Sequence, residues 1–412
     1  MMQLNLSKID RWLSIQIFLL FVLFPTVTQW SNIPMFLIVI SWFLLLKQKS
    51  VVTTIKSQPI LWILIAVVAV ILVGLVYTPA TPEWINPHLR KYARFFYVIV
   101  LVTLLINTPH LQKTALSGFM LAMSFVLAST WLNIWFLLPW SVTQALGWGQ
   151  SHIVFGDYIT QNVMMSLFVI LCFHRFVQTH HKLRWLWFLT GLLGAISITH
   201  LSQGRTGFML LAVAMCAFIL IIAKKKYWLS SFIVLAAILT FLFVSSDIVQ
   251  ERFKQGVNEL IEGKNYRNST IGHRLYNYKT TVSMIAKKPL FGHGTGAYHT
   301  EICQYLLPDD DCTVFHWHPH SQFLLIGADH GAIGLLLYAG LIWAMFYIGL
   351  KTRDPLARIL MLTLATMLLF NSLINSPWWS TRESQFFSYM LALAIAMCAN
   401  KNKSDHEDPS RS

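Results

Sequence analysis

Three short polar stretches hold the side chains best suited to chemistry. They are Ser202-Gln203-Gly204-Arg205-Thr206-Gly207, Gly272-His273-Arg274 and His316-Trp317-His318-Pro319-His320-Ser321. The planar fork of an arginine matches phosphate oxygens, so Arg205 and Arg274 together could neutralise a pyrophosphate. A neutral imidazole at His320 could accept a proton from a sugar hydroxyl. These residue types predict group transfer from a diphosphate.

Each of these residues also has a plainer interpretation. Arg205 could extend its guanidinium to a membrane interface, and Arg274 could lie on the solvated face of a helix. Zinc-ligand types occur together at Cys312, His316, His318 and His320, but alternate spacing sends neighbouring histidines to opposite faces of a strand or helix. We therefore expect no metal and no cofactor, while both interpretations of the arginines stay open.

A long helix is expected directly after the histidines. Pro319 suits a first helical turn, and the following residues run apolar to Leu350. His320 would then lie in the first turn, where the helix dipole disfavours imidazolium, although a bound pyrophosphate would favour it. Asp329 and His330 lie deeper in the same helix, in a structural or a substrate role. Residues 292–296 read as a turn, since they lack the lysine of a phosphate loop.

Composition places the chain in a membrane. Of its 412 residues, 56% are hydrophobic and only 12% charged, with a mean hydropathy of +0.57, which is more apolar surface than a soluble fold could bury. The net charge of +14 comes largely from Lys and Arg in short loops between apolar runs. Orientation in the membrane explains this charge better than nucleic acid does.

The apolar runs predict an all-α polytopic membrane protein with one transmembrane domain over residues 1–412. The runs have about the length that a helix needs to cross a bilayer. Twelve spans are expected, near 12–29, 33–46, 60–77, 95–107, 115–138, 160–177, 185–200, 207–222, 228–245, 323–350, 356–375 and 385–399. Between the ninth and tenth spans, a helical loop over residues 246–319, with helix-like stretches at 249–261 and 270–286, would cap the bundle. A polar tail over residues 400–412 is expected to be disordered.

The distribution of Lys and Arg predicts the orientation. Alternate short loops carry most of these residues, so that side and both termini are expected to be cytoplasmic. The three polar stretches then share the opposite face. Arg90, Lys91 and Arg94 lie on this face as well, as interface anchors or as lipid-phosphate contacts. Cys303 and Cys312 share the long loop, and whether they form a disulfide stays open.

The pattern around His320 resembles a known family. A His, then Asn, Ser or Gln, nine residues and Gly-x-x-Gly is typical of O-antigen ligases, and here His320 and Ser321 are followed after nine residues by Gly331 and Gly334. The stretches around Arg205 and Arg274 resemble the two arginine segments of the same proteins. The chain is therefore similar to the O-antigen ligase WaaL family and, more distantly, to Wzy-type O-antigen polymerases and O-linked oligosaccharyltransferases.

The resemblance implies a membrane-embedded glycosyltransferase of the bacterial inner membrane, active on the periplasmic face. Arg205 and Arg274 would hold the pyrophosphate of an undecaprenyl-diphosphate-linked glycan. His320 would activate a hydroxyl of lipid A-core in an inverting, metal-independent transfer, with His318, Ser321, Gly331 and Gly334 as supporting residues. Membrane lipids are the other expected partners, and the oligomeric state is unknown.

Other functions fit parts of the pattern. A polymerase or an O-oligosaccharyltransferase would use the same donor with another acceptor. A transporter of lipid-linked glycans would also have many spans and polar residues within them, although the sequence lacks the paired interrupted helices typical of such repeats. A zinc-dependent hydrolase is a further alternative.

Overall fold

The computed structural model describes residues 6–45, 48–261, 269–315 and 317–404. Helices make up 79% of the structure, and the described residues form no strand. The expectation of an all-α fold is therefore confirmed.

The helices follow one another with short connections. They are α1 (Leu6–Leu23), α2 (Asn32–Leu45), α3 (Gln48–Ser57), α4 (Pro59–Tyr77), α5 (Pro82–Asn107), α6 (His110–Leu132), α7 (Tyr158–Gln178), α8 (Arg184–His200), α9 (Arg205–Ile222), α10 (Trp228–Val244), α11 (Asp247–Ile261), α12 (Thr270–Lys287), α13 (Tyr298–Glu301), α14 (Cys312–Phe315), α15 (Gln322–Lys351), α16 (Pro355–Ile374) and α17 (Thr381–Ser404). Short 3-10 turns lie at Thr28–Ser31, Lys225–Tyr227 and Ile302–Tyr305.

Each of the twelve expected spans overlaps a helix, although those expected at 12–29 and 115–138 run six residues beyond the ends of α1 and α6. Among the described residues, seven helical segments are long and apolar enough to cross a membrane. They include α4, α6, α7, α9, α15, α16 and, together with the turn before it, α10. The count of twelve stays a prediction, because helices such as α2 and α8 are shorter than these seven.

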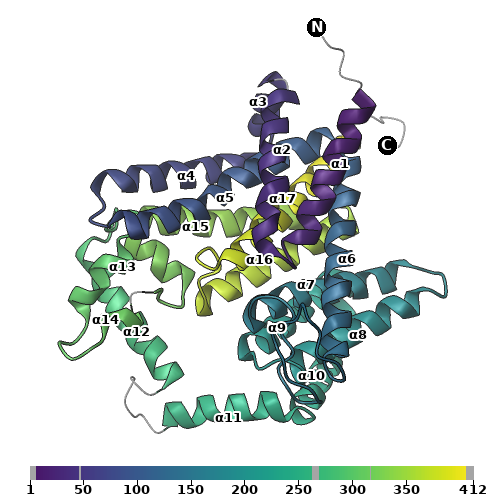
Figure 1. The fold of residues 1–412 in the computed structure, drawn as a ribbon. Helices are drawn as coiled ribbons and strands as arrows, with labels where there is room; N and C mark the ends of the chain where they lie inside the picture. Colours follow the sequence, from purple (N-terminus) through teal and green to yellow (C-terminus); the bar gives the residue numbers. More distant parts are fainter. Residues whose placement is uncertain (1–5, 46–47, 262–268, 316, 405–412) are drawn as a thin grey trace.

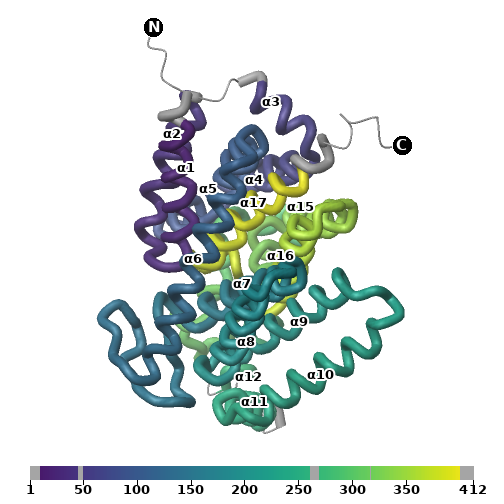
Figure 2. Tube along the Cα trace, turned by 90° about the vertical axis from the view of Figure 1, so that its right-hand side faces the viewer, coloured from purple at the N-terminus to yellow at the C-terminus, as the bar shows by residue number. Residues whose placement is uncertain are grey.

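The core forms around the helices at the centre of the molecule. α17 packs along α5, α15 packs along α16, and α7 packs along α8 and α9. Figure 1 shows α16 and α17 in the middle, with α1 and α6 on one side and α4 and α15 on the other. Figure 2 shows α3 and α11 at opposite ends of the molecule. The polar helices α11 and α12 thus lie at the end away from α3.

Large apolar side chains cover much of the outer surface. Leu229 and Phe241 on α10, and Leu336 and Trp343 on α15, each expose about two thirds or more of their area. Soluble proteins rarely leave contiguous apolar faces of this kind in contact with water. The outer surface is therefore that of a membrane protein.

The long segment between α10 and α15 contains the two helices that its sequence suggests. α11 and α12 cover the helical stretches expected at residues 249–261 and 270–286. The segment continues through residues 288–321, where Cys303 and Cys312 are joined in a disulfide. α12 packs on α11 and on α15, so it connects this segment to the bundle.

α15 is interrupted at Gly331. This residue has φ 60° and ψ −153°, a conformation that is essentially restricted to glycine. The loop of residues 289–296 fills the interruption. Its His293 and Gly294 N–H groups donate to the carbonyls of Ala328 and Asp329, at 2.9 and 2.8 Å.

The same loop also forms hydrogen bonds with the start of the second half of α15. Pro289 and Leu290 carbonyls accept from the N–H groups of Ala332 and Ile333, at 2.8 and 3.3 Å. Backbone groups freed by the interruption are therefore satisfied by the loop, as a buried helix end requires. The stretch Gly292-His293-Gly294-Thr295-Gly296 is a turn, as expected, and it completes a broken helix.

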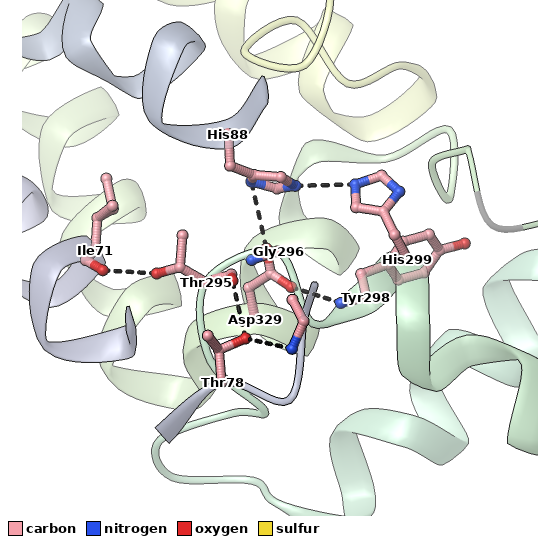
Figure 3. Close-up of polar contacts among 9 residues, drawn as sticks. Ile71, Thr78, His88, Thr295, Gly296, Tyr298, His299 and Asp329 are labelled. Atoms are coloured by element: carbon pink, nitrogen blue, oxygen red, sulfur yellow. Dashed lines mark hydrogen bonds and ion pairs between the residues drawn. The ribbon is translucent and has the colours of Figure 1, made fainter. Parts of the chain in front are cut away.

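A fully buried carboxylate secures this arrangement. Asp329 accepts hydrogen bonds from the N–H groups of Gly296 and Tyr298, at 3.1 and 2.9 Å. Its Oδ2 lies 3.7 Å from Nδ1 of His88 on α5, and His88 Nε2 lies 2.9 Å from His299 Nε2. Figure 3 shows the row from Asp329 through His88 to His299. These contacts favour a structural role for Asp329, which joins α5, the loop and α15.

Candidate active site

Three arginines line one cavity at the end of the bundle where α11 and α12 lie. The cavity has a volume of about 380 Å³ and is bordered by α7, α9, α11, α12 and the end of α16. Arg205, Arg252 and Arg274 belong to its lining. No ion pair among the described residues includes any of the three. Uncompensated cationic groups around one cavity favour an anionic ligand.

Arg205 is the first residue of α9 and follows the cap residue Gly204. Its Nη1 donates to the carbonyl of Arg252 at 3.3 Å, and its Nη2 donates to Thr270 Oγ1 at 3.1 Å. A Cβ on Gly207 would approach the Asn162 side chain to 2.3 Å, so this glycine lets α9 pack closely on α7. Arg205 is thus held at the start of α9, in contact with both α11 and α12 of the long segment.

Glu259 fixes the two helices of the long segment to each other. Its carboxylate accepts from Thr270 Oγ1 at 2.8 Å and from the Ile271 N–H at 3.0 Å, at the start of α12. The start of a helix is favourable for a carboxylate. Thr270 Oγ1 also accepts a hydrogen bond from Arg205. The bond between Arg205 and Thr270 therefore sets the position of α12 relative to α9.

Arg274 lies in the second turn of α12, as expected from the sequence. Its Nη1 donates to the carbonyl of Ile374 at 3.2 Å. This carbonyl belongs to the last residue of α16, where helix carbonyls lack intrahelical partners. Burial lowers the pKa of Arg274, and the nearby Arg205 lowers it further. An arginine remains protonated under these conditions, so it brings a partly desolvated positive charge to the cavity.

His320 does not lie in the first helical turn, contrary to the expectation from Pro319. α15 begins at Gln322, and Ser321 is its cap residue, with its side chain accepting from the Leu324 N–H. Serine is a strong N-cap, because its oxygen satisfies a free helix N–H, and this preference outweighs that of Pro319 for a first turn. His320 instead has a left-handed backbone with φ 53°. Such a φ is uncommon for residues other than glycine.

α12 holds the backbone of residues 317–321, here called the histidine loop. Tyr278 Oη donates to the His320 carbonyl at 3.0 Å and to the Leu373 carbonyl at 3.1 Å. Asn277 Nδ2 donates to the His318 carbonyl at 3.2 Å. Since Tyr278 lies one turn after Arg274, the same helix positions an arginine of the cavity and the candidate base.

The two histidines are close and uncharged at neutral pH. The N–H of His320 donates to His318 Nδ1 at 3.1 Å, and the two ring centroids are 4.2 Å apart. Burial, followed by His318 and Arg274, lowers the pKa of His320 to about 2, and burial and Arg274 lower that of His318 to about 3. A neutral imidazole is the form that accepts a proton.

The structure brings most of the expected site residues to one region. Arg205 and Arg274 line one cavity, and His320 is tied to it through α12. Ser321 caps α15, where its hydroxyl also donates to the Ser372 carbonyl at 3.2 Å. The two glycines of the Gly-x-x-Gly pattern, at positions 331 and 334, lie at the interruption of α15 and in the close packing after it. They support the helix that follows His320.

A metal site was one alternative for the histidine stretch. Within the part of the chain that the structure describes, no three His, Cys, Asp or Glu side chains are grouped so that they could hold a metal ion. Cys312 is joined to Cys303, and His316 lies outside the described residues.

Arg252 is a cavity residue that the sequence did not single out. It lies on α11, and its Nη2 donates to Gln203 Oε1 at 2.8 Å. Tyr278 and Asn277 were also missed as supports of the histidine loop. The polar face of the helical stretch around residues 249–261 was the available signal for Arg252, but no spacing rule relates it to Arg205.

The central part of the sequence matches a known family. Residues 189–339 match the family model described as O-antigen ligase, Wzy_C. No curated protein matches the chain at a significant level. The matched segment runs from α8 into α15, so it contains all three cavity arginines, the histidine loop and the interruption of α15.

Proposed function

Because the chain belongs to the O-antigen ligase family through its domain at residues 189–339, we propose that it transfers O-polysaccharide from undecaprenyl diphosphate to lipid A-core. The proposed reaction takes place at the periplasmic face of the bacterial inner membrane. The observation that carries this proposal is the cavity with three arginines, none of which forms an ion pair with an acidic side chain among the described residues, joined through α12 to a neutral histidine.

The arginine cavity would hold the donor diphosphate. Arg205 and Arg274 are the proposed ligands of its oxygens, and Arg252 adds a third positive charge to the same cavity. Charge develops on the departing diphosphate as the bond to the sugar breaks, so fixed cationic donors stabilise the transition state more than the ground state. The hydrogen bonds that hold Arg205 and Arg274 in place reduce the side-chain reorganisation that diphosphate binding requires.

His320 would act as the general base. A hydroxyl of the acceptor sugar attacks the anomeric carbon of the donor, and the bond between this carbon and the diphosphate oxygen breaks. The electron pair of that bond leaves with undecaprenyl diphosphate, and the hydroxyl proton passes to His320. Attack from the side opposite the leaving group inverts the anomeric centre. The bound diphosphate raises the basicity of His320, because it offsets the positive charge of Arg274.

Purified protein tests the proposal directly. With lipid-linked glycan, lipid A-core and a chelator, the protein should form capped lipopolysaccharide. His320→Ala should abolish product formation while the protein remains folded, and His110→Ala, at an exposed histidine on α6, should leave the rate unchanged. Full activity of His320→Ala would remove His320 as the base.

The acceptor requirement separates this proposal from its relatives. Glycan chains that lengthen on the lipid carrier without lipid A-core would indicate a polymerase. Transfer to a protein hydroxyl would indicate an O-oligosaccharyltransferase. Movement of intact lipid-linked glycan across vesicles, with no bond broken, would indicate a transporter.

A further inference from the structure

A second cavity borders the histidine loop. It has a volume of about 250 Å³ and lies between α5, the loop before α15 and the connection from α16 to α17. Lys91, Trp317, His318, Ser376 and Trp379 are part of its lining. Sites for drug-sized ligands have volumes of about 300–1,000 Å³, so this cavity suits a single sugar residue.

Two buried polar atoms at this cavity have no hydrogen-bond partner in the described ranges of the chain. Ser376 is 1% exposed and Trp379 is 5% exposed. Neither Ser376 Oγ nor Trp379 Nε1 has a partner among the described residues. Leaving a buried donor unsatisfied costs about 1–3 kcal/mol, and native proteins seldom do so without a reason. A polar ligand in the cavity would supply the missing partners.

The ammonium of Lys91 also has no acidic partner within the part of the chain that the structure describes. Lys91 Nζ lies 3.0 Å from the ring centroid of Trp379, and no ion pair among the described residues includes Lys91. Its neighbours on α5 are Arg90 and Arg94, and Arg94 donates to Ser384 Oγ. Burial, then Arg94 and Arg90, lowers the pKa of Lys91 to about 7. An anionic ligand would balance this local excess of positive charge.

Aromatic rings border the same cavity. The ring centroids of Trp317 and Trp379 are 5.8 Å apart, and the rings are inclined by 80°. Trp317 is 57% exposed, so its ring is accessible from outside. Flat aromatic faces beside a few polar groups match the mixed surface of a sugar, which has apolar C–H faces and a polar rim.

The cavity adjoins the candidate base. His318 belongs to its lining, and His318 Nδ1 accepts the backbone N–H of His320. On the other side, Tyr278 joins His320 to the helix that carries Arg274. His320 is therefore tied to the linings of both cavities, as a base between a donor and an acceptor must be.

We propose that this second cavity is the acceptor-sugar subsite and that it selects a sugar with an anionic substituent, a phosphate or a carboxylate, which Lys91 binds. Ser376 and the Trp379 N–H would bind sugar hydroxyls, and Trp317 would cover one face of the ring. This inference rests on the proposed transferase function, since it assigns the place of the second substrate.

Steady-state kinetics test the subsite with matched acceptors. Wild-type protein should prefer phosphorylated or acidic lipid A-core over the same core without the anionic group. Lys91→Gln should raise the KM for the anionic core about 10- to 100-fold, the range for losing one charge-assisted hydrogen bond. The KM for the donor, and that for the neutral core, should not change. Lys91→Arg should restore part of the preference.

Matched controls guard against a general loss of structure. Lys113→Gln, on α6 at a separate cavity, should behave as wild type. Trp317→Ala, at an exposed position, should raise the KM for both cores without lowering the melting temperature. An unchanged preference in Lys91→Gln, or an equal fall in kcat for both acceptors, would overturn the subsite.

Direct binding separates the subsite from the transfer reaction. Calorimetry with a delipidated, phosphorylated core oligosaccharide should show binding to wild-type protein that Lys91→Gln weakens about tenfold or more. Such binding without transfer to any acceptor would refute the proposed function and keep the sugar site. Equal binding of the dephosphorylated oligosaccharide would refute the subsite. It would also be refuted if Lys91→Gln weakened binding to vesicles of anionic phospholipid but left binding of the phosphorylated oligosaccharide unchanged.

Discussion

Replacing Gly331 by alanine should strongly destabilise the protein, because the interruption of α15 depends on this residue. The φ and ψ of Gly331 are 60° and −153°, and such a conformation costs a residue with a Cβ about 1–3 kcal/mol. The added Cβ would also lie 2.5 Å from the Leu290 carbonyl oxygen and 2.6 Å from the Gly292 nitrogen. Both are backbone atoms, so relief requires the loop to move.

Movement of the loop would weaken the four backbone hydrogen bonds that it makes with α15. Each contributes about 1 kcal/mol. With the conformational cost, we expect a loss of about 3–6 kcal/mol, a large part of the 5–15 kcal/mol typical of folded proteins. At about 2 °C for each kcal/mol in larger domains, the melting temperature should fall by about 6–12 °C.

Gly340 in the same helix provides the matched control. A Cβ added there would meet no atom within 4 Å. Gly340→Ala should therefore stabilise the helix by about 0.5–1 kcal/mol. Thermal unfolding in one detergent, followed by circular dichroism at a fixed scan rate, would compare the variants even if unfolding is irreversible. A Gly331→Ala protein that melts within 2 °C of Gly340→Ala would refute this account of the interruption.

Three further results are expected. Arg205→Lys should lower kcat/KM roughly 100-fold, because an ammonium cannot replace the two-pronged donor, and kinetics with the lipid-linked donor would show it. Raising the pH from 6 to 8 should raise the KM for an anionic acceptor about tenfold, because Lys91 is protonated mainly below its pKa of about 7. The charged and titratable groups beside it are Arg90, Arg94 and His318. Lys91→Gln should remove this pH dependence of the KM. Replacing both Cys303 and Cys312 by serine should destabilise the loop by about 3 kcal/mol, seen as faster proteolysis there.

Much of the helical framework could be predicted from the sequence. Apolar runs bounded by charged residues located α7, α9 and α16 to within a few residues, because length and hydropathy are local properties of a membrane helix. Two of the three cavity arginines, Arg205 and Arg274, were found through residue chemistry and family resemblance. Their meeting at one cavity depends on how α9 and α12 pack, and only the structure shows it.

Features that depend on distant partners were missed. The Gly-x-x-Gly pattern was recognised, but its role requires the loop of residues 289–296 to enter α15. The row from Asp329 to His299 joins three segments far apart in the chain. At His320 the error was local, because the helix start was placed from Pro319 alone and the cap preference of Ser321 was not considered. Lys91 and Ser376 line the same cavity only because α5 packs against the connection from α16 to α17, which the sequence does not reveal.

The interruption at Gly331 divides α15 into unequal rods. The first, residues 322–330, has nine residues and a length of about 14 Å; the second, residues 332–351, has twenty and a length of about 30 Å. The longer rod by itself equals the thickness of a hydrocarbon layer. The shorter one is therefore not needed to cross that layer. It carries Asp329, which is surrounded by the loop and His88, and it begins directly after the proposed base.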